Sequence, residues 1–275
     1  MGFMRFCSLG SGSAGNAMLL QWTHQAKTHQ ILLDCGFSER ELIQRLGMRG
    51  LSIEALDAIL ITHEHGDHLG KAPSIAARHG VELWSTFGTL RPVLIAQAKS
   101  AMPLRHRRLR AGESQDLFGM QIEAVAVPHD ASEPVQFIFN LARDKALPLR
   151  LGVLTDLGHA SAHVIARFKG LDALVVEANH DVQLLEQSGY PASLKKRVGG
   201  DWGHLSNDQS AALLQAIDAA SLSCVIAAHL SRQNNHPDRV RSTMHQRLGH
   251  AFAQRLIIAD QHEGFDWQLA DKKAG

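Results

Sequence analysis

Four potential metal ligands lie close together in the segment Thr62–Gly70. His63, His65, Asp67 and His68 follow the order His-x-His-x-Asp-His. Imidazole and carboxylate groups suit Zn²⁺ and Mn²⁺, and a loop that aims side chains in two directions could hold two such ions. A solvated histidine-rich loop without metal is the alternative, and the number of ligands in so short a segment argues against it.

The residues around this cluster predict its place in the fold. Ala58–Ile61 is short, apolar and partly β-branched, which is typical of a buried strand. Gly66 and Gly70 bracket a turn. The ligands are therefore expected on a loop that leaves the end of a strand, where α/β folds usually place their chemistry.

The cluster resembles the signature of the metallo-β-lactamase fold superfamily. Further segments extend the resemblance, because each places a polar residue directly after an apolar run: Asp34, His129, Asp156 and His229. The match runs from residue 5 to about residue 260. The resemblance implies a two-metal hydrolase, in which Asp34 has a supporting role behind the ligands.

The resemblance also implies a role for each ligand. The first metal ion would be held by His63, His65 and His129. The second would be held by Asp67, His68 and His229. Asp156 would bridge the two ions, and Asp67 would also orient or deprotonate the attacking water.

Apolar patterning predicts strands first, and then strands alternating with helices. The expected strands are Met4–Leu9, Ala17–Trp22, Gln30–Asp34, Ala58–Ile61, Val81–Ser85, Met120–Val127, Val135–Ala142, Leu149–Thr155, Ala173–Glu177, Cys224–Ala228 and Leu256–Asp260. The expected helices are Ser38–Leu46 with a capping box, Ala72–His79, Thr89–Ala98, Ala160–Phe168, Asp181–Gln187, Ser206–Ala220 and His236–Leu248. This order indicates an α/β protein, a four-layer αβ/βα sandwich formed by one domain of residues 1–275.

Composition narrows the class of protein. The chain has 275 residues, of which 45% are hydrophobic and 20% charged, enough for a substantial core. The formal net charge of +1 gives no global basic field that would attract nucleic acid. Neither a signal peptide nor a stretch approaching ~20 apolar residues is present, so no membrane partner and a cytoplasmic location are expected. The cysteines Cys7, Cys35 and Cys224 form no regular disulfide pattern, which favours a reducing compartment.

Four further segments bear on the reaction. Ser8–Asn16 is a glycine-rich loop whose backbone N–H groups could cradle a phosphate, or simply a tight hairpin loop. Glu177–Asp181 clusters polar residues at a strand end, which helix capping explains in part. Gly203–Asn207 places a histidine before a capped helix, beside the basic run Lys195–Arg197. His229–Pro237 continues the last ligand with a polar string.

Together these segments resemble the YycJ-like (WalJ-like) branch of the superfamily, a group regarded as 5′→3′ DNA exonucleases. Ala14 departs from it, because a serine is expected there. The resemblance implies a phosphodiesterase that acts on DNA ends, which are expected to be single-stranded, with two divalent ions (Zn or Mn). It implies catalytic roles for Asp67, for His204 at the departing oxygen and for His180 nearby. The implied substrate-binding residues are Ser11, Ser13, Asn16, Asn179, Ser231, Asn234 and Asn235.

Two other functions fit the same ligands. One is a hydrolase of a small ester, thioester, lactone or lactam, which would need a closed apolar pocket. The other is a metal-dependent scaffold without catalysis, which the complete ligand set argues against. A groove lined by arginine and lysine would favour nucleic acid. Because the net charge is near zero, contacts with a strand must come from local segments: Gly10–Asn16, Lys195–Arg197 and Arg232–Asn235.

Overall fold

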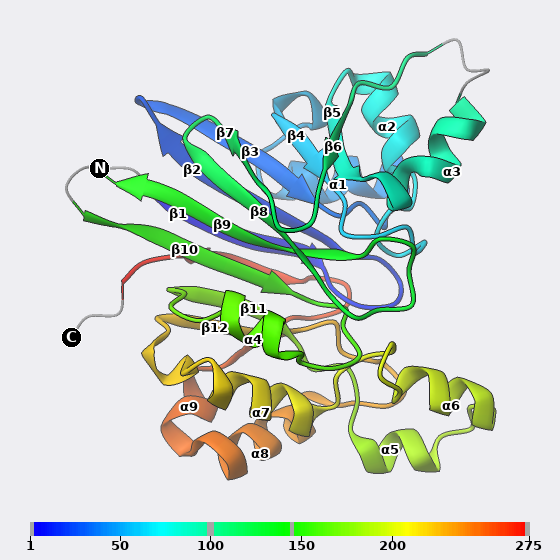
Figure 1. Cartoon of the computed structure of the whole chain (residues 1–275), viewed down its shortest axis with the longest axis vertical. Coiled ribbons are helices and arrows are strands. Elements are labelled where there is room, and N and C mark those ends of the chain that lie inside the picture. The colour runs from blue at the N-terminus through cyan, green and yellow to red at the C-terminus, as the bar shows by residue number, and fades with distance from the viewer. Residues whose placement is uncertain (1–2, 98–101, 144–145, 273–275) are drawn as a thin grey trace.

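Two mixed sheets face each other, and helices cover the outer side of each (Figure 1). The computed structural model describes residues 3–97, 102–143 and 146–272. The first sheet has the strand order β14 (Phe265–Leu269), β1 (Met4–Gly10), β2 (Ala17–His24), β3 (Lys27–Leu33), β4 (Ala58–Leu60), β5 (Glu82–Thr86) and β6 (His106–Leu109). The second has the order β13 (Ile257–Ile258), β12 (Cys224–Ala228), β11 (Ala173–Glu177), β10 (Ala146–Leu154), β9 (Val135–Arg143), β8 (Met120–Ala126) and β7 (Ser114–Leu117).

The helices lie in two outer layers. The first sheet is covered by α1 (Glu39–Met48), α2 (Ala72–His79) and α3 (Phe87–Gln97). The second is covered by α4 (Ala162–Arg167), α7 (Asn207–Ala216), α8 (Pro237–Leu248) and α9 (His250–Arg255). Two short helices, α5 (Val182–Gln187) and α6 (Ala192–Val198), extend from one end of the second layer (Figure 1).

Three hydrophobic cores hold these layers together. Strand β2 shows how, because successive side chains of a strand point to opposite faces. Leu20 and Trp22 enter the core between the two sheets, whereas Leu19 enters the core under α1 and α2. The third core, beneath α7 and α8, contains Phe168 and Met244. The four-layer αβ/βα sandwich expected from the sequence is thereby confirmed.

Strand directions bring the predicted ligands to one edge. In the first sheet β3, β4 and β5 are parallel. In the second, β10, β11 and β12 are parallel, and β8 has the same direction as β10 because each is antiparallel to β9. The segments that carry the ligands follow the carboxyl ends of β4, β8, β10 and β12. The ligands therefore meet at one end of the sandwich.

Several predicted boundaries were wrong. The helix that begins after Ser206 ends at Ala216, because Asp218 adopts a left-handed backbone with φ 58°. Ser38 caps α1, but the second half of the predicted capping box is missing because Glu41 pairs with Arg45 instead. Strands β6, β7 and β14 and helices α6 and α9 were not predicted. The last residue of the predicted helix Thr89–Ala98 lies outside the described residues.

Candidate metal centre

Seven nitrogen- and oxygen-bearing side chains from both sheets converge at this edge. Their donor atoms form overlapping groups in which all atoms lie within 4.8 Å of one another. One group is His63, His65 and His129, and a second is Asp67, His68 and His229. Asp156 belongs to a group with His63 and His68 and to another with His229. The structure thus brings together all the ligands expected from the sequence, with Asp156 between the two sets.

Three histidines each use one ring nitrogen within the protein. His63 Nδ1 lies 2.9 Å from Thr62 Oγ1, and His129 Nδ1 donates to Gly203 O at 3.0 Å. His65 instead donates from Nε2 to Asp130 O at 3.2 Å. The opposite nitrogens then face one another, with His129 Nε2 lying 3.3 Å from His65 Nδ1. Such contacts fix the ring orientation and leave one lone pair for a cation.

His68 is held between two buried carboxylates. Its Nδ1 donates to Asp34 Oδ2 at 2.8 Å, and its Nε2 lies 3.2 Å from Asp156 Oδ2. Asp34 adopts a left-handed backbone (φ 60°) and accepts from Thr62 N at 2.9 Å. Burial opposes a charged imidazole, but Asp156 and Asp34 outweigh it and raise the pKa of His68 to about 9. The site therefore attracts positive charge at the position of the second set.

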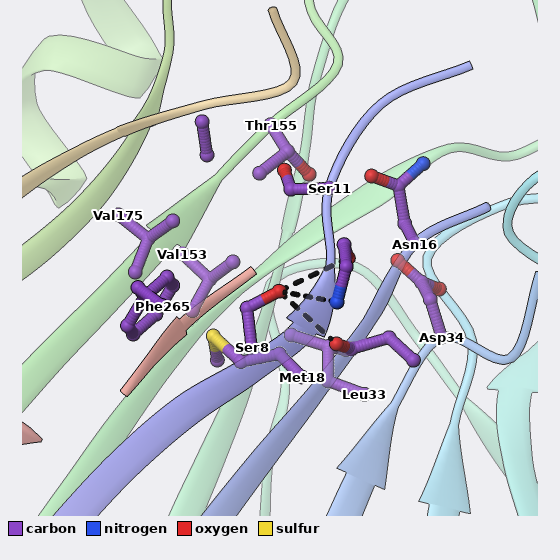
Figure 2. A pocket seen from close by; sticks show the side chains of 13 residues that line it. Ser8, Ser11, Asn16, Met18, Leu33, Asp34, Val153, Thr155, Val175 and Phe265 are labelled. Atoms are coloured by element: carbon purple, nitrogen blue, oxygen red, sulfur yellow. Dashed lines mark hydrogen bonds between the residues drawn. The ribbon is translucent and has the colours of Figure 1, made fainter. Parts of the chain in front are cut away.

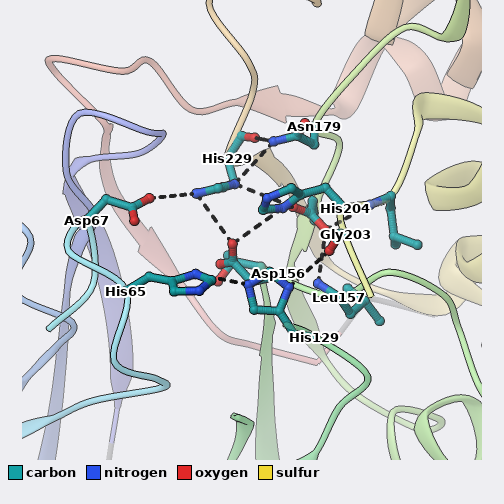
Figure 3. A network of polar contacts seen from close by, with 12 residues as sticks. His65, Asp67, His129, Asp156, Leu157, Asn179, Gly203, His204 and His229 are labelled. Carbon is teal, nitrogen blue, oxygen red and sulfur yellow. Dashed lines mark hydrogen bonds and ion pairs between the residues drawn. The ribbon is translucent and has the colours of Figure 1, made fainter. Parts of the chain in front are cut away.

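Glu177 supports two histidines from the floor of the site. It is completely buried, and its Oε1 accepts from His204 Nδ1 at 2.7 Å and lies 3.4 Å from His229 Nδ1. Asp156 lies at the centre of this network (Figure 3), with Oδ1 3.5 Å from both His229 Nε2 and His204 Nδ1. Burial opposes the charge on His204, but Glu177 outweighs this and raises the pKa of His204.

The donor set fits divalent cations. His63 Nε2 is buried and has no hydrogen-bond partner among the described residues. Asp156 Oδ2 also lacks one, because its 3.2 Å approach to His68 Nε2 does not have hydrogen-bonding geometry. Buried polar atoms are normally satisfied, so both point to a missing partner. Nitrogen and oxygen donors suit Zn²⁺ or Mn²⁺, and no cysteine belongs to any of the described donor groups.

The donors open into a polar pocket of about 310 Å³. Its wall includes Ser13 from the glycine-rich loop and Arg197 from α6, together with Asp130 beside the first set of histidines. Leu194 and Val198 are its larger apolar residues. The pocket is thus walled mainly by polar and charged groups.

A smaller cavity lies between the sheets (Figure 2). Its volume is about 30 Å³, which is room for a water molecule or two. Asp34, Asn16 and Thr155 border it on one side, and Val153 and Val175 on another. It is too small for an acyl substrate, so the wider pocket is the candidate substrate site.

Most of the predicted substrate-binding side chains hold the protein's own backbone. Ser11 Oγ accepts from His229 N at 2.9 Å, which supports the left-handed backbone of that ligand (φ 56°). Asn179 Nδ2 donates to His229 O at 3.0 Å. Asn16 Nδ2 lies 3.3 Å from Asp67 Oδ2. These three residues therefore contact the predicted metal ligands rather than the pocket interior.

The other predicted residues are distributed differently. Ser231 Oγ accepts from Asn234 N at 3.1 Å, and the buried Asn235 donates to Ala178 O at 2.8 Å. Ser13 is exposed and lines the pocket. His180 is buried, belongs to none of the donor groups, and has a pKa lowered to about 4 because burial disfavours its charged form.

Glu177 is a functional candidate that the sequence analysis did not single out, although the sequence contains a signal for it. Glu177 ends the otherwise apolar strand β11, and a carboxylate at the end of a buried strand requires a partner. Its partner His204 is 27 residues away in the chain. Only the fold places the two side chains together.

Comparison with known proteins supports the fold and identifies the family. A model of the β-lactamase superfamily domain matches residues 29–226. Exodeoxyribonuclease WalJ of Streptococcus pneumoniae serotype 2 (strain D39 / NCTC 7466) is 31% identical over 268 residues, covering 97% of this chain and 93% of that protein. Exodeoxyribonuclease YycJ of Bacillus anthracis is 30% identical over 248 residues, covering 89% of each. The metallo-β-lactamase fold protein YhfI of Bacillus subtilis superposes with a TM-score of 0.71 at 14% identity, covering 98% of this chain and 100% of that one.

Proposed function

The chain belongs to the metallo-β-lactamase superfamily as a metal-dependent hydrolase, and we propose that it is a phosphodiesterase that digests DNA from the 5′ end. The main support for this proposal is the convergence of the donor groups at the base of a polar pocket whose wall includes Ser13 and Arg197. Relatives named as exodeoxyribonucleases match nearly the whole chain, which supports DNA as the substrate. We propose that residues 1–275 form one hydrolase domain, because both sheets supply ligands.

Two divalent ions, Zn or Mn, are proposed as the cofactors. His63, His65 and His129 would hold one, Asp67, His68 and His229 the other, and Asp156 both. Bound cations supply Lewis acidity and lower the pKa of water. Asn16 orients Asp67 by a contact of 3.3 Å, so this carboxylate can accept a proton from an attacking water.

His204 is proposed as the acid at the departing oxygen. Glu177 binds Nδ1 and so directs the opposite ring nitrogen away from the buried carboxylate. The raised pKa favours the protonated ring, which can donate to a leaving alkoxide. His180 is proposed to assist His204. Its buried ring lies close enough to Glu177 and His204 to interact with both electrostatically.

The pocket wall favours a phosphodiester over a small acyl substrate. Ser13 and Arg197 present a hydroxyl and a guanidinium group to the pocket, whereas a closed apolar chamber of sufficient size is not found among the cavities described. Ser13 is proposed to face the substrate. Ser11, Asn16 and Asn179 are proposed to act through the ligands that they contact, and Ser231, Asn234 and Asn235 through the shape of the loop after β12.

The cytoplasm is the proposed compartment. The thiols of Cys7, Cys35 and Cys224 are free, and free thiols are typical of reducing compartments. No helix in the described part of the chain is long and apolar enough to cross a membrane.

Single-stranded DNA ends are proposed as the preferred substrate.

A panel of substrates tests the proposal. Metal-loaded protein would be incubated with 5′-labelled single-stranded DNA, the matching duplex, RNA of the same sequence, a thioester and a lactone. We expect digestion of the single strand at the highest rate, with mononucleotides released from the 5′ end. Hydrolysis of the thioester or lactone with intact DNA would instead assign the site to small acyl substrates.

A further inference from the structure

A tryptophan is exposed beside the metal pocket. Trp202 lies between α6 and α7 and is 62% exposed, whereas Trp22 and Trp84 are completely buried. Consecutive Cα atoms are ~3.8 Å apart, so Trp202 lies within ~7.6 Å of His204 along the backbone. The indole ring has no aromatic or cation–π partner among the residues that the structure describes. A large apolar surface is therefore left open next to the reactive groups.

The backbone that carries this ring is held firmly. Trp202 O accepts from Asp130 N at 2.9 Å, and the next carbonyl, Gly203 O, accepts from the ligand His129 at 3.0 Å. Asp201 O accepts from His159 Nδ1 at 2.9 Å. The exposed ring therefore projects from a segment tied to the metal centre, and its exposure does not result from a loose loop.

The ring borders an open groove of about 420 Å³ that continues the metal pocket. Asp130 and Arg197 line both spaces and form the wall between them. Lys196 lies on the groove and forms no ion pair within the described residues, while Asp201 supplies a carboxylate. Two cationic and two anionic side chains thus balance, so the groove suits a neutral planar group better than a phosphate.

We propose that Trp202 is the floor of a nucleobase subsite for the nucleotide next to the scissile phosphodiester. This inference rests on the proposed function, because a strand whose phosphate occupies the metal pocket must continue past the Asp130–Arg197 wall. Aromatic side chains stack on any base, so the subsite holds single strands without reading their sequence. In a duplex the base is stacked and paired, so the same subsite disfavours double-stranded ends.

Steady-state digestion of single-stranded DNA by Trp202→Ala, Trp202→Phe and wild-type protein tests the subsite. Stacking on an aromatic side chain contributes roughly 5- to 150-fold in affinity, so Trp202→Ala should raise KM at least fivefold. Trp202→Phe should stay within about threefold of wild type because a ring remains. Leu269→Ala, which removes another exposed apolar side chain (59% exposed) at the far edge of the first sheet, should leave KM unchanged.

A strand with one abasic nucleotide, moved stepwise from the 5′ end, locates the base. At the matching position the abasic strand should raise KM for wild type but add nothing to the KM of Trp202→Ala, because each change removes the same contact. Equal KM values for wild type and Trp202→Ala on intact DNA, or an undiminished abasic effect in the variant, would overturn the subsite while leaving the nuclease function in place. Failure of wild type to digest any nucleic acid would instead reject the proposed function and the subsite with it.

Discussion

Each histidine of the metal centre divides its two ring nitrogens between the protein and the cation site. His129 gives Nδ1 to Gly203 O and His68 gives Nδ1 to Asp34, whereas His65 gives Nε2 to Asp130 O. Contacts of this kind fix both tautomer and orientation, so the proposed ligands would be aligned before a cation binds. His204 differs because Glu177 anchors it but it lies outside the two proposed histidine sets.

Replacing His204 with alanine should lower turnover on DNA by about 10²- to 10⁴-fold, the usual contribution of a positioned acid. Metal content should be unchanged, as measured by elemental analysis of the purified variant. His163→Ala, at an exposed position on α4, serves as the matched control and should behave as wild type. Wild-type turnover in the His204 variant would make it an ordinary loop residue, and loss of metal would make it a ligand.

Replacing Asp156 with alanine should abolish cooperative binding of the two proposed ions, because this carboxylate lies within 4.8 Å of donor atoms from both sets. His129→Ala should mainly weaken the binding of one ion, because His129 belongs only to the first set of donors, with His63 and His65. Calorimetric titration of the metal-free variants with Mn²⁺ would separate the two patterns. If the Asp156→Ala variant binds two ions tightly and independently, Asp156 does not bridge them.

At the scale of elements, the site is a consequence of where strands end. Ala58–Leu60 and Cys224–Ala228 are apolar runs followed by ligands, so sequence alone predicts both the strands and the side chains at their ends. The capped start of α7 is predictable for the same local reason, since Ser206 and Gln209 complete a capping box. Such features depend on neighbours in the chain.

Local sequence patterns do not predict contacts between segments that are distant in the chain. Ser11 Oγ accepts from His229 N across 218 residues, so a residue that appeared suited to phosphate instead supports a ligand backbone. Helix α6 was missed because its short polar sequence has no buried residue to mark it. Strand β14 was missed because it is half exposed at the sheet edge and its pairing with β1 is visible only in the fold.

Gly36 shows how tightly the elements approach at the site. A Cβ at this position would lie 2.0 Å from Asp67 O, so Gly36→Ala must displace the metal loop. We expect lower metal affinity and a loss of stability of about 1–3 kcal/mol, typical of overpacking. Gly47→Ala is the control, because no atom lies within 4 Å of its Cβ in α1 and alanine favours helices by up to ~1 kcal/mol. Chemical denaturation of both variants would show opposite signs, and an unchanged Gly36→Ala would contradict the close approach.

For the whole molecule, charge sets the mode of substrate binding. A net charge of +1 provides no long-range attraction for nucleic acid. Arg197 is already paired with Asp130 at 2.5 Å, so few cations remain for phosphates near the pocket. Local contacts, and not a basic surface, would have to hold the proposed nucleic-acid strand.

Binding of single-stranded DNA to a catalytically inactive Asp67→Ala variant should therefore weaken with salt, but shallowly. Each phosphate contact contributes about −0.7 to the log–log slope on single strands, and only a few contacts are available. Fluorescence anisotropy across a salt series measures the slope. A salt-independent affinity, or no binding at low salt, would favour a small-molecule substrate.

The most direct test of a dinuclear nuclease is a titration of metal-free protein with Mn²⁺ or Zn²⁺. The same samples are assayed for bound metal per chain and for digestion of 5′-labelled single-stranded DNA. The seven nitrogen and oxygen ligands predict that activity rises until two ions are bound per chain and then levels off. Full activity with one ion per chain, or intact DNA after two ions are bound, would contradict a dinuclear nuclease.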